Sequence, residues 1–167
     1  WTEGVTDYFA ARLYAEWKQR PEDLATLCYE SYKNYLAIEH RTRMTMAEEN
    51  RRHVGGDNTE LLVYRKGMLA GLLLDAAIRR ATAGRATLDH AARRLLAMAA
   101  ERSSRSVRES EIRSVVVEVG GRGTVARLWD RVVGGVSQLT ETEVTEALRD
   151  VTGRTLNPPG QPKRRKV

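Results

Sequence analysis

The sequence is poor in the residues that build self-contained reactive sites, with one cysteine and three histidines in 167 residues. A single cysteine cannot form a disulfide within the chain, so the fold requires no oxidising compartment. Cys28 stands between Leu27 and Tyr29 in a helical pattern, and we interpret it as a core residue. The chain contains no H-E-x-x-H, Cys-x-x-Cys, Walker or G-x-S-x-G motif. Its own residues therefore supply neither a metal-binding histidine pair nor a nucleophile with its base.

Long hydrophobic runs are also absent. The most apolar stretch, residues 67–77, is shorter than the ~18 residues needed to span a bilayer and contains Asp75. The composition, 41% hydrophobic and 30% charged residues, is ordinary for a globular protein. We therefore expect a soluble domain with no membrane partner, and the sequence indicates no particular compartment.

Positive charge is concentrated at the C-terminus. The formal net charge is +6, and residues 163–166 carry four positive charges, which leaves +6 − 4 = +2 for the remainder. We expect residues 157–167 to be a disordered basic tail and residues 1–156 to be the folded part. The tail resembles a nuclear localisation signal. One hypothesis is therefore a non-enzymatic helical binding module whose tail binds nucleic acid or an import receptor, although short basic termini are more often simply solvated.

Hydrophobic periodicity predicts a mainly α fold, a helical bundle. Residues 109–119 read as a helix or a strand, and residues 40–58 as irregular with one short turn near 47–50. His40 and His53 fall in this polar segment and are interpreted as surface residues. The other predicted helices span residues 2–20, 21–39, 60–82, 87–101, 124–133 and 140–153.

Two of these helices have informative patterns. In the first, Val5, Phe9, Leu13 and Trp17 recur every four residues, which predicts one apolar stripe. The helix at 60–82 is apolar nearly all round between residues 68 and 78, which is typical of a buried central helix. Its glycines at positions 67 and 71 reduce helix propensity, so we expect them to allow another backbone to approach closely.

Four short motifs, taken in order, resemble one enzyme family. They are Trp1-Thr2-Glu3-Gly4-Val5-Thr6, Tyr64-Arg65-Lys66-Gly67, Leu72-Leu73-Leu74-Asp75-Ala76-Ala77-Ile78-Arg79, and the segment L-W-D-R-V-V-G-G at 128–135. Together they resemble gluzincin metallopeptidases, and within that group the glycyl aminopeptidase family, whose members often carry a PDZ domain. The resemblance covers about residues 1–156. It implies the C-terminal helical half of a thermolysin-like catalytic domain.

The resemblance also implies roles for two residues. Glu3 matches the third ligand of a catalytic Zn²⁺, and Tyr64 matches the tyrosine that donates a hydrogen bond to the oxyanion of the tetrahedral intermediate. Two histidines and the general base of an H-E-x-x-H helix would lie upstream of Trp1, so we expect this chain by itself to be an incomplete and inactive fragment. Its partners would be a peptide substrate and that upstream part of the domain, with nucleic acid not expected.

Simpler interpretations of these residues remain open. Glu3 follows Thr2, a candidate N-cap, and an acidic residue in a first turn is favoured by the helix dipole. Tyr64 could be an aromatic residue that packs on the core at the start of a helix. Lys66 is assigned no role and is equally well interpreted as a solvated charge near a helix start.

Overall fold

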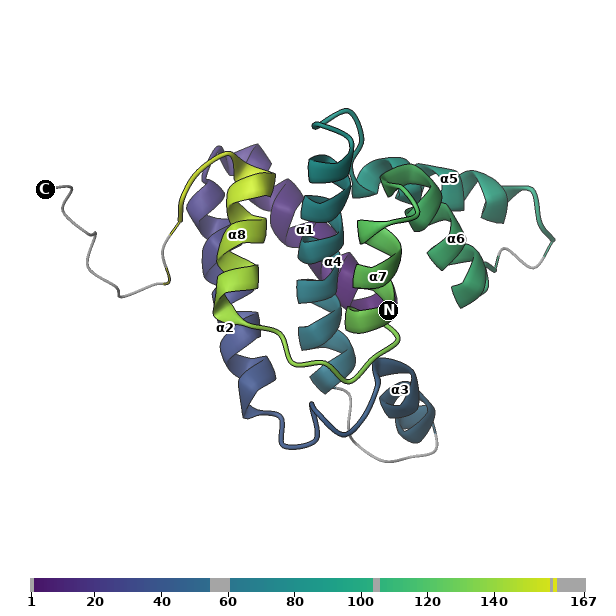
Figure 1. Ribbon diagram of the computed structural model, residues 1–167, viewed down its shortest axis with the longest axis horizontal. Coiled ribbons are helices and arrows are strands. Elements are labelled where there is room, and N and C mark those ends of the chain that lie inside the picture. The colour runs from purple at the N-terminus through teal and green to yellow at the C-terminus, as the bar shows by residue number, and fades with distance from the viewer. Residues whose placement is uncertain (1, 55–60, 104–105, 157, 159–167) are drawn as a thin grey trace, which may run out of the picture.

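A computed structural model of the chain describes residues 2–54, 61–103, 106–156 and 158. The described residues form eight α-helices and no strand, which confirms the predicted mainly α fold (Figure 1). Apart from Pro158, the predicted basic tail lies outside the described residues, as do Trp1 and the Gly55-Gly56 loop. The helices are α1 Thr2–Lys18, α2 Pro21–Ala37, α3 Met46–Val54, α4 Leu61–Ala81, α5 Leu88–Ala100, α6 Glu109–Gly120, α7 Thr124–Val132 and α8 Glu141–Thr152.

Helix α4 is the centre of the molecule. It packs against each of the other seven helices, with α2 and α8 on the left of α4 and α7 on its right in Figure 1. Every side chain from Lys66 to Ile78 that is not glycine is buried. The prediction of a buried central helix is therefore confirmed, and burial of this apolar surface is the main force that holds the bundle together.

The closest helix contact joins α1 and α4 through glycines. A Cβ atom placed on Gly4 would lie 2.5 Å from the Cα atom of Gly67, and one placed on Gly67 would lie 2.9 Å from the Cα of Gly4. One turn further along α4, a Cβ on Gly71 would lie 2.9 Å from the Cβ of Tyr8. The expectation that Gly67 and Gly71 admit a neighbouring backbone is thus confirmed.

The predicted apolar stripe of α1 is wrong. Val5 is buried, but Leu13 is 55% exposed and Trp17 is 73% exposed. A step of four residues advances about 40° beyond a full turn of an α-helix, so three such steps carry the stripe about 120° around the axis. The face that packs on α4 instead carries three small residues and one large one, namely Gly4, Ala11, Ala15 and Tyr8.

The segment predicted to be irregular contains a full helix, α3. Thr45 and Glu48 form a capping box, in which the Thr45 hydroxyl accepts from the Glu48 amide at 3.1 Å and the Glu48 carboxylate accepts from the Thr45 amide at 2.7 Å. That Thr-x-x-Glu signal is present in the sequence. It marks the beginning of a longer helix than the short turn predicted there.

Other local predictions are confirmed. The ambiguous V-V-V segment belongs to helix α6. Thr140 and Glu143 form the predicted capping box of α8, and Gly153 ends that helix in the left-handed conformation with φ of 69°. Gly84 follows α4 with φ of 78°. Among the described residues, no helix is both long enough and apolar enough to cross a membrane.

Candidate functional site

A cleft of about 420 Å³ lies where the beginnings of α1 and α4 meet α3, α6 and the end of α7. Five separate elements contribute to its walls, so the cleft exists only in the folded chain. Half of the lining residues are polar, and both signs of charge are present. The lining residues are Glu3, Met46, Ala47, Asn50, Arg51, Val63, Glu109 and Val133.

Glu3 lies in the first turn of α1 with an exposed side chain. Its position relative to α4 is fixed by the next residue, because a Cβ on Gly4 would lie only 2.6 Å from the carbonyl oxygen of Val63. Within the described part of the chain, the Glu3 carboxylate makes no hydrogen bond or ion pair. Glu3 is therefore a carboxylate that faces the cleft and has the capacity to bind a cation there.

Tyr64 lies in the first turn of α4 and is half-buried. It is not itself among the lining residues of the cleft, whereas its neighbour Val63 is. A half-buried phenol is compatible with a hydrogen-bond donor and equally with an aromatic residue packed on the core. The structure therefore brings Glu3 and the Val63-Tyr64 turn together, and both interpretations of the phenol remain open.

The beginning of α4 is held by a buried carboxylate from α3. Glu49 is fully buried, and its two oxygens accept from the amides of Leu62, at 3.2 Å, and Val63, at 2.6 Å. The Nε2 atom of His40 lies 2.9 Å from the same carboxylate. The interpretation of His40 as a surface residue is thus wrong, because it is half-buried against Glu49; the side chain of His53 lies outside the described structure. Glu49 satisfies amides that an α-helix leaves free at its N-terminus.

Lys66 is fully buried, so its interpretation as a solvated charge is wrong. Its ammonium donates a hydrogen bond of 2.6 Å to the carbonyl oxygen of Gly135 in the connection between α7 and α8. Burial, followed by the nearby charge of Arg131, lowers the pKa of Lys66 from its ordinary value of 10.5 to about 8. Because Gly135 is two residues beyond Val133, this contact fixes one wall of the cleft to α4.

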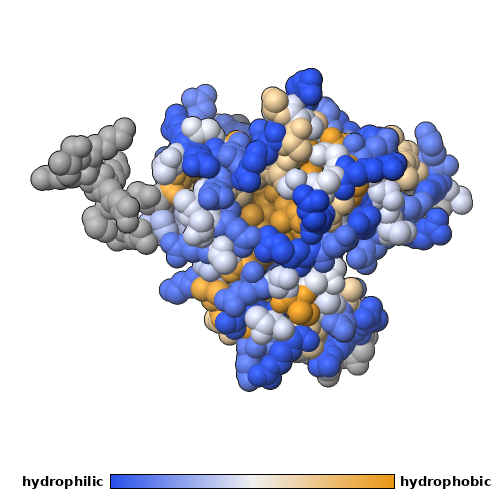
Figure 2. Space-filling model, in the orientation of Figure 1, coloured by the Kyte–Doolittle hydropathy of each residue, from blue (hydrophilic) through white to orange (hydrophobic). Residues whose placement is uncertain are grey.

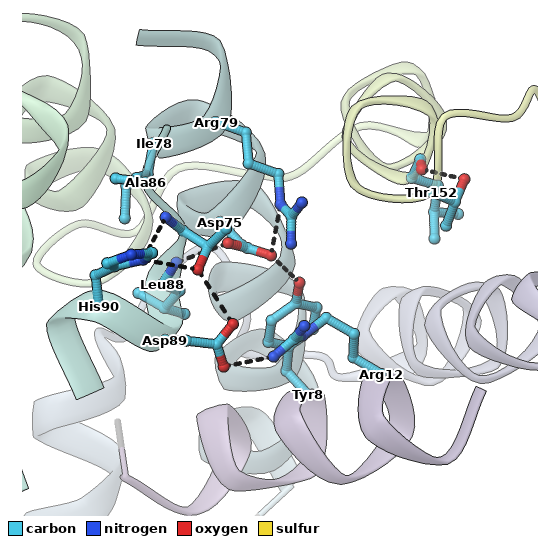
Figure 3. Close-up of polar contacts among 12 residues, drawn as sticks. Tyr8, Arg12, Asp75, Ile78, Arg79, Ala86, Leu88, Asp89, His90 and Thr152 are labelled. Carbon is cyan, nitrogen blue, oxygen red and sulfur yellow. Dashed lines mark hydrogen bonds and ion pairs between the residues drawn. The ribbon is translucent and has the colours of Figure 1, made fainter. Parts of the chain in front are cut away.

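A second polar cluster lies towards the other end of α4 (Figure 3). Both oxygens of the buried Asp75 carboxylate are used: Oδ2 accepts from the Tyr8 hydroxyl at 2.6 Å and from Arg79 at 3.1 Å, and Oδ1 accepts from the Leu88 amide at 2.7 Å. Burial, followed by the charge of Asp75, raises the pKa of Tyr8 well above its ordinary value. This cluster has no lining residue in the cleft, and it joins α1, α4 and the beginning of α5.

A buried arginine extends that cluster. Arg12 donates to Asp89 at 2.5 Å and to Glu16 at 2.7 Å, and its guanidinium lies 5.7 Å from the centre of the Phe9 ring. Because each charge in the cluster has a partner, we interpret the cluster as structural.

The described residues fit part of a zinc site. A catalytic zinc takes three protein ligands and a water molecule. Glu3 can supply one carboxylate, but no three His, Cys, Asp or Glu side chains are grouped for metal binding in the described ranges. Zinc binding by the described residues alone would therefore be incomplete.

Comparisons with protein-family models, with curated proteins and with solved structures find no match.

Several residues of the site could not be recognised from local sequence. Arg51 and Glu109 lie 58 residues apart and share the cleft only through the packing of α3 and α6 around α4. Glu49 carried no signal beyond an acidic residue in a polar segment. For Lys66 a signal did exist, because it precedes a nearly continuous apolar run in the central helix.

Proposed function

We propose that the chain is the C-terminal helical part of the catalytic domain of a zinc-dependent metallopeptidase of the glycyl aminopeptidase type. In this proposal, two histidines and a glutamate base belong to an upstream part of the same domain. Glu3 is the third zinc ligand, and Tyr64 donates the hydrogen bond to the oxyanion. The reaction is hydrolysis of a peptide bond near a free N-terminus.

The observation that carries the proposal is the contact between Gly4 and Gly67. These glycines are the last residues of two motifs of the resemblance, T-E-G and Y-R-K-G, and the two backbones touch at that point. The contact sets Glu3 and Val63 on one cleft, although 60 residues separate them in sequence. Two motifs proposed to act at one reaction centre thus lie on adjacent helix turns.

The residues of this chain would act by position and charge. A bound zinc ion would polarise the scissile carbonyl and lower the pKa of its water. Tyr64, as a neutral phenol with an ordinary pKa of about 10, would donate to the developing oxyanion at pH 7. Glu49 would hold the turn that carries Tyr64, because it binds the amides of Leu62 and Val63.

Zinc binding tests the role of Glu3. The experiment uses a protein extended upstream to include the H-E-x-x-H segment, in which zinc content is measured for the parent and for Glu3→Gln. We expect Glu3→Gln to lose most of its zinc, because the amide is neutral and a weaker ligand. Asp7→Asn, one turn along the same exposed face, is the matched control and should retain zinc. Equal zinc content in parent and Glu3→Gln would refute the ligand assignment.

The role of Tyr64 is tested by kinetics in the same extended protein. Loss of one oxyanion donor typically lowers kcat by about 10²–10³-fold, so we expect Tyr64→Phe to show that loss with little change in KM and full zinc content. Tyr14→Phe, a 47% exposed tyrosine of α1, serves as the control. A Tyr64→Phe variant with parental kcat would show that this phenol only packs on the core.

A further inference from the structure

The cleft holds more charge than a metal ligand requires. Glu109 enters it from the first turn of α6, and Arg51 enters it from α3. The lining of the same cleft also includes the apolar side chains of Met46, Val63 and Val133. One cleft therefore offers an anion, a cation and an apolar surface at the same time.

Glu109 is not occupied by a structural task. In α6 the capping role belongs to Glu111, whose carboxylate accepts from the Arg108 amide at 2.9 Å and pairs with Arg102 at 2.7 Å. In the residues that the structure describes, the Glu109 carboxylate has no hydrogen bond or ion pair. The cap of α3 is similarly provided by Glu48 with Thr45. The hydrogen-bonded caps of α6 and α3 therefore do not involve Glu109 or Arg51.

We propose that the cleft binds a short peptide whose two ends are both free, with Glu109 bound to its α-ammonium and Arg51 bound to its α-carboxylate. This inference rests on the proposed function for the class of substrate, and it assigns the groups that recognise that substrate. Because Glu3 is committed to the metal in that function, Glu109 is the carboxylate left for the ammonium.

The chemistry of each end matches its partner. A guanidinium presents paired N–H donors in the geometry that a carboxylate accepts. An ammonium donates to a carboxylate in a charge-assisted hydrogen bond. The cleft volume of about 420 Å³ lies within the usual range of small-ligand sites, roughly 300–1,000 Å³. It suits one short peptide with an apolar side chain against Met46 and the two valines.

The test uses the chain as it stands, in buffer with a chelator so that zinc plays no part. Isothermal titration calorimetry measures the Kd of glycyl-leucine, of its N-acetyl derivative and of its C-terminal amide. Hydrogen bonds to charged groups contribute about 1.5–3 kcal/mol, which is roughly 10–150-fold in Kd. We expect N-acetylation and amidation each to weaken binding to the parent chain by a factor in that range.

Variants then assign each end to its residue. In Glu109→Gln, glycyl-leucine should bind as weakly as its N-acetyl derivative binds the parent, and N-acetylation should cause no further loss. In Arg51→Gln, glycyl-leucine should bind as weakly as its C-terminal amide binds the parent, and amidation should cause no further loss. Glu118→Gln, on α6 but paired with Arg94 outside the cleft lining, is the control and should bind like the parent. Circular dichroism establishes that each variant is folded.

The outcomes separate this inference from the proposed function. The assignment of ends would be overturned if glycyl-leucine did not bind the parent. It would also be overturned if blocking one end of the peptide weakened binding to the corresponding variant by the same factor as binding to the parent. Suppose that Glu3→Gln of the extended protein retains its zinc and the peptide affinities of the variants are as expected. The zinc-ligand role of Glu3 would then be refuted, and the assignment of the peptide site would be retained.

Discussion

The two ends of helix α4 each carry a buried charged side chain, and the two side chains differ in the number of hydrogen-bond partners that they have. Towards the C-terminal end, the Asp75 carboxylate receives hydrogen bonds from a hydroxyl, a guanidinium and a backbone amide. Near the N-terminal end, the Lys66 ammonium has one carbonyl acceptor, that of Gly135. Both side chains are almost completely buried. Three donors compensate the buried Asp75 carboxylate, whereas burial lowers the pKa of Lys66 to about 8.

This difference distinguishes a polar cluster that stabilises the fold from a cleft that is able to bind a ligand. A buried cluster in which each charge has a partner fixes one arrangement of helices and offers no free carboxylate to a ligand. At the other end, the cleft carries Glu3 and Glu109, whose carboxylates have no partner in the described residues. Functional groups need such spare binding capacity, and the helix that carries both regions supplies a rigid base for it.

The largest expected effect comes from breaking the saturated cluster. Asp75→Ala would leave the Tyr8 hydroxyl and the Leu88 amide buried without their acceptor, and such changes cost about 3–5 kcal/mol of unfolding free energy. Urea unfolding followed by circular dichroism measures this loss. The control is Asp130→Ala, whose carboxylate pairs with Arg113 at the surface and should contribute at most about 1 kcal/mol. A loss for Asp75→Ala no larger than that of the control would contradict the structural role of the cluster.

An intermediate effect is expected at the glycine contact. Gly67→Ala would place a methyl group 2.9 Å from the Cα of Gly4, and backbone cannot yield as a flexible side chain does. Overpacking of this kind typically costs about 1–3 kcal/mol. Gly123→Ala is the comparison variant, because its Cβ would meet no atom within 4 Å, and only the preference of an N-cap for glycine over alanine, worth less than about 1 kcal/mol, is expected to act there. Equal stability of the two variants by urea unfolding would show that α1 and α4 do not depend on this close approach.

The smallest effect at neutral pH is expected for Lys66→Met, yet its pH dependence is distinctive. The folded pKa of about 8 lies below the ordinary 10.5, so between these values the unfolded chain binds more protons than the folded chain. Stability of the parent should therefore rise as pH increases above 8, by at most about 1.4 kcal/mol per pH unit. Lys66→Met should lack this rise.

Urea unfolding at pH 7 to 9.5 measures the difference, a window that stops below the titration of tyrosine. The control is Lys33→Met, since Lys33 is exposed on α2 and should retain the parental rise. At pH 7 we expect Lys66→Met to be at least as stable as the parent, because an apolar residue of similar volume replaces a poorly compensated charge. Parallel pH profiles for the parent and Lys66→Met would show that the Lys66 ammonium is not penalised by burial.

Much of the local structure followed from residue patterns. The capping box of Thr140 and Glu143, the Gly153 terminus and the apolar α4 were predicted correctly, because each depends on neighbours within a few positions. The outward face of α1 was predicted wrongly. An apolar residue at every fourth position looked like a core stripe, but the packing surface of α1 is selected by the small residues that fit α4.

For the candidate site, the sequence motifs identified Glu3 and Tyr64 as candidates but did not predict which residues lie next to them. Arg51, Glu109 and Glu49 come from helices distant in sequence, so no spacing rule could group them. Lys66 was assigned no role, because a lysine at a helix start is usually solvated. Its burial depends on the α7–α8 connection, which crosses α4 some 69 residues later.

By itself, the sequence determined six of the eight helices of the described residues, most of their ends and the choice of α4 as the central element. These follow from hydrophobic periodicity and hydrogen bonds between near neighbours. Only the tertiary structure decided which face of α1 is buried, which carboxylates are saturated and which remain open at the cleft. Burial and electrostatic pairing depend on what packs against a side chain, and that is settled when α4 is enclosed by the other helices.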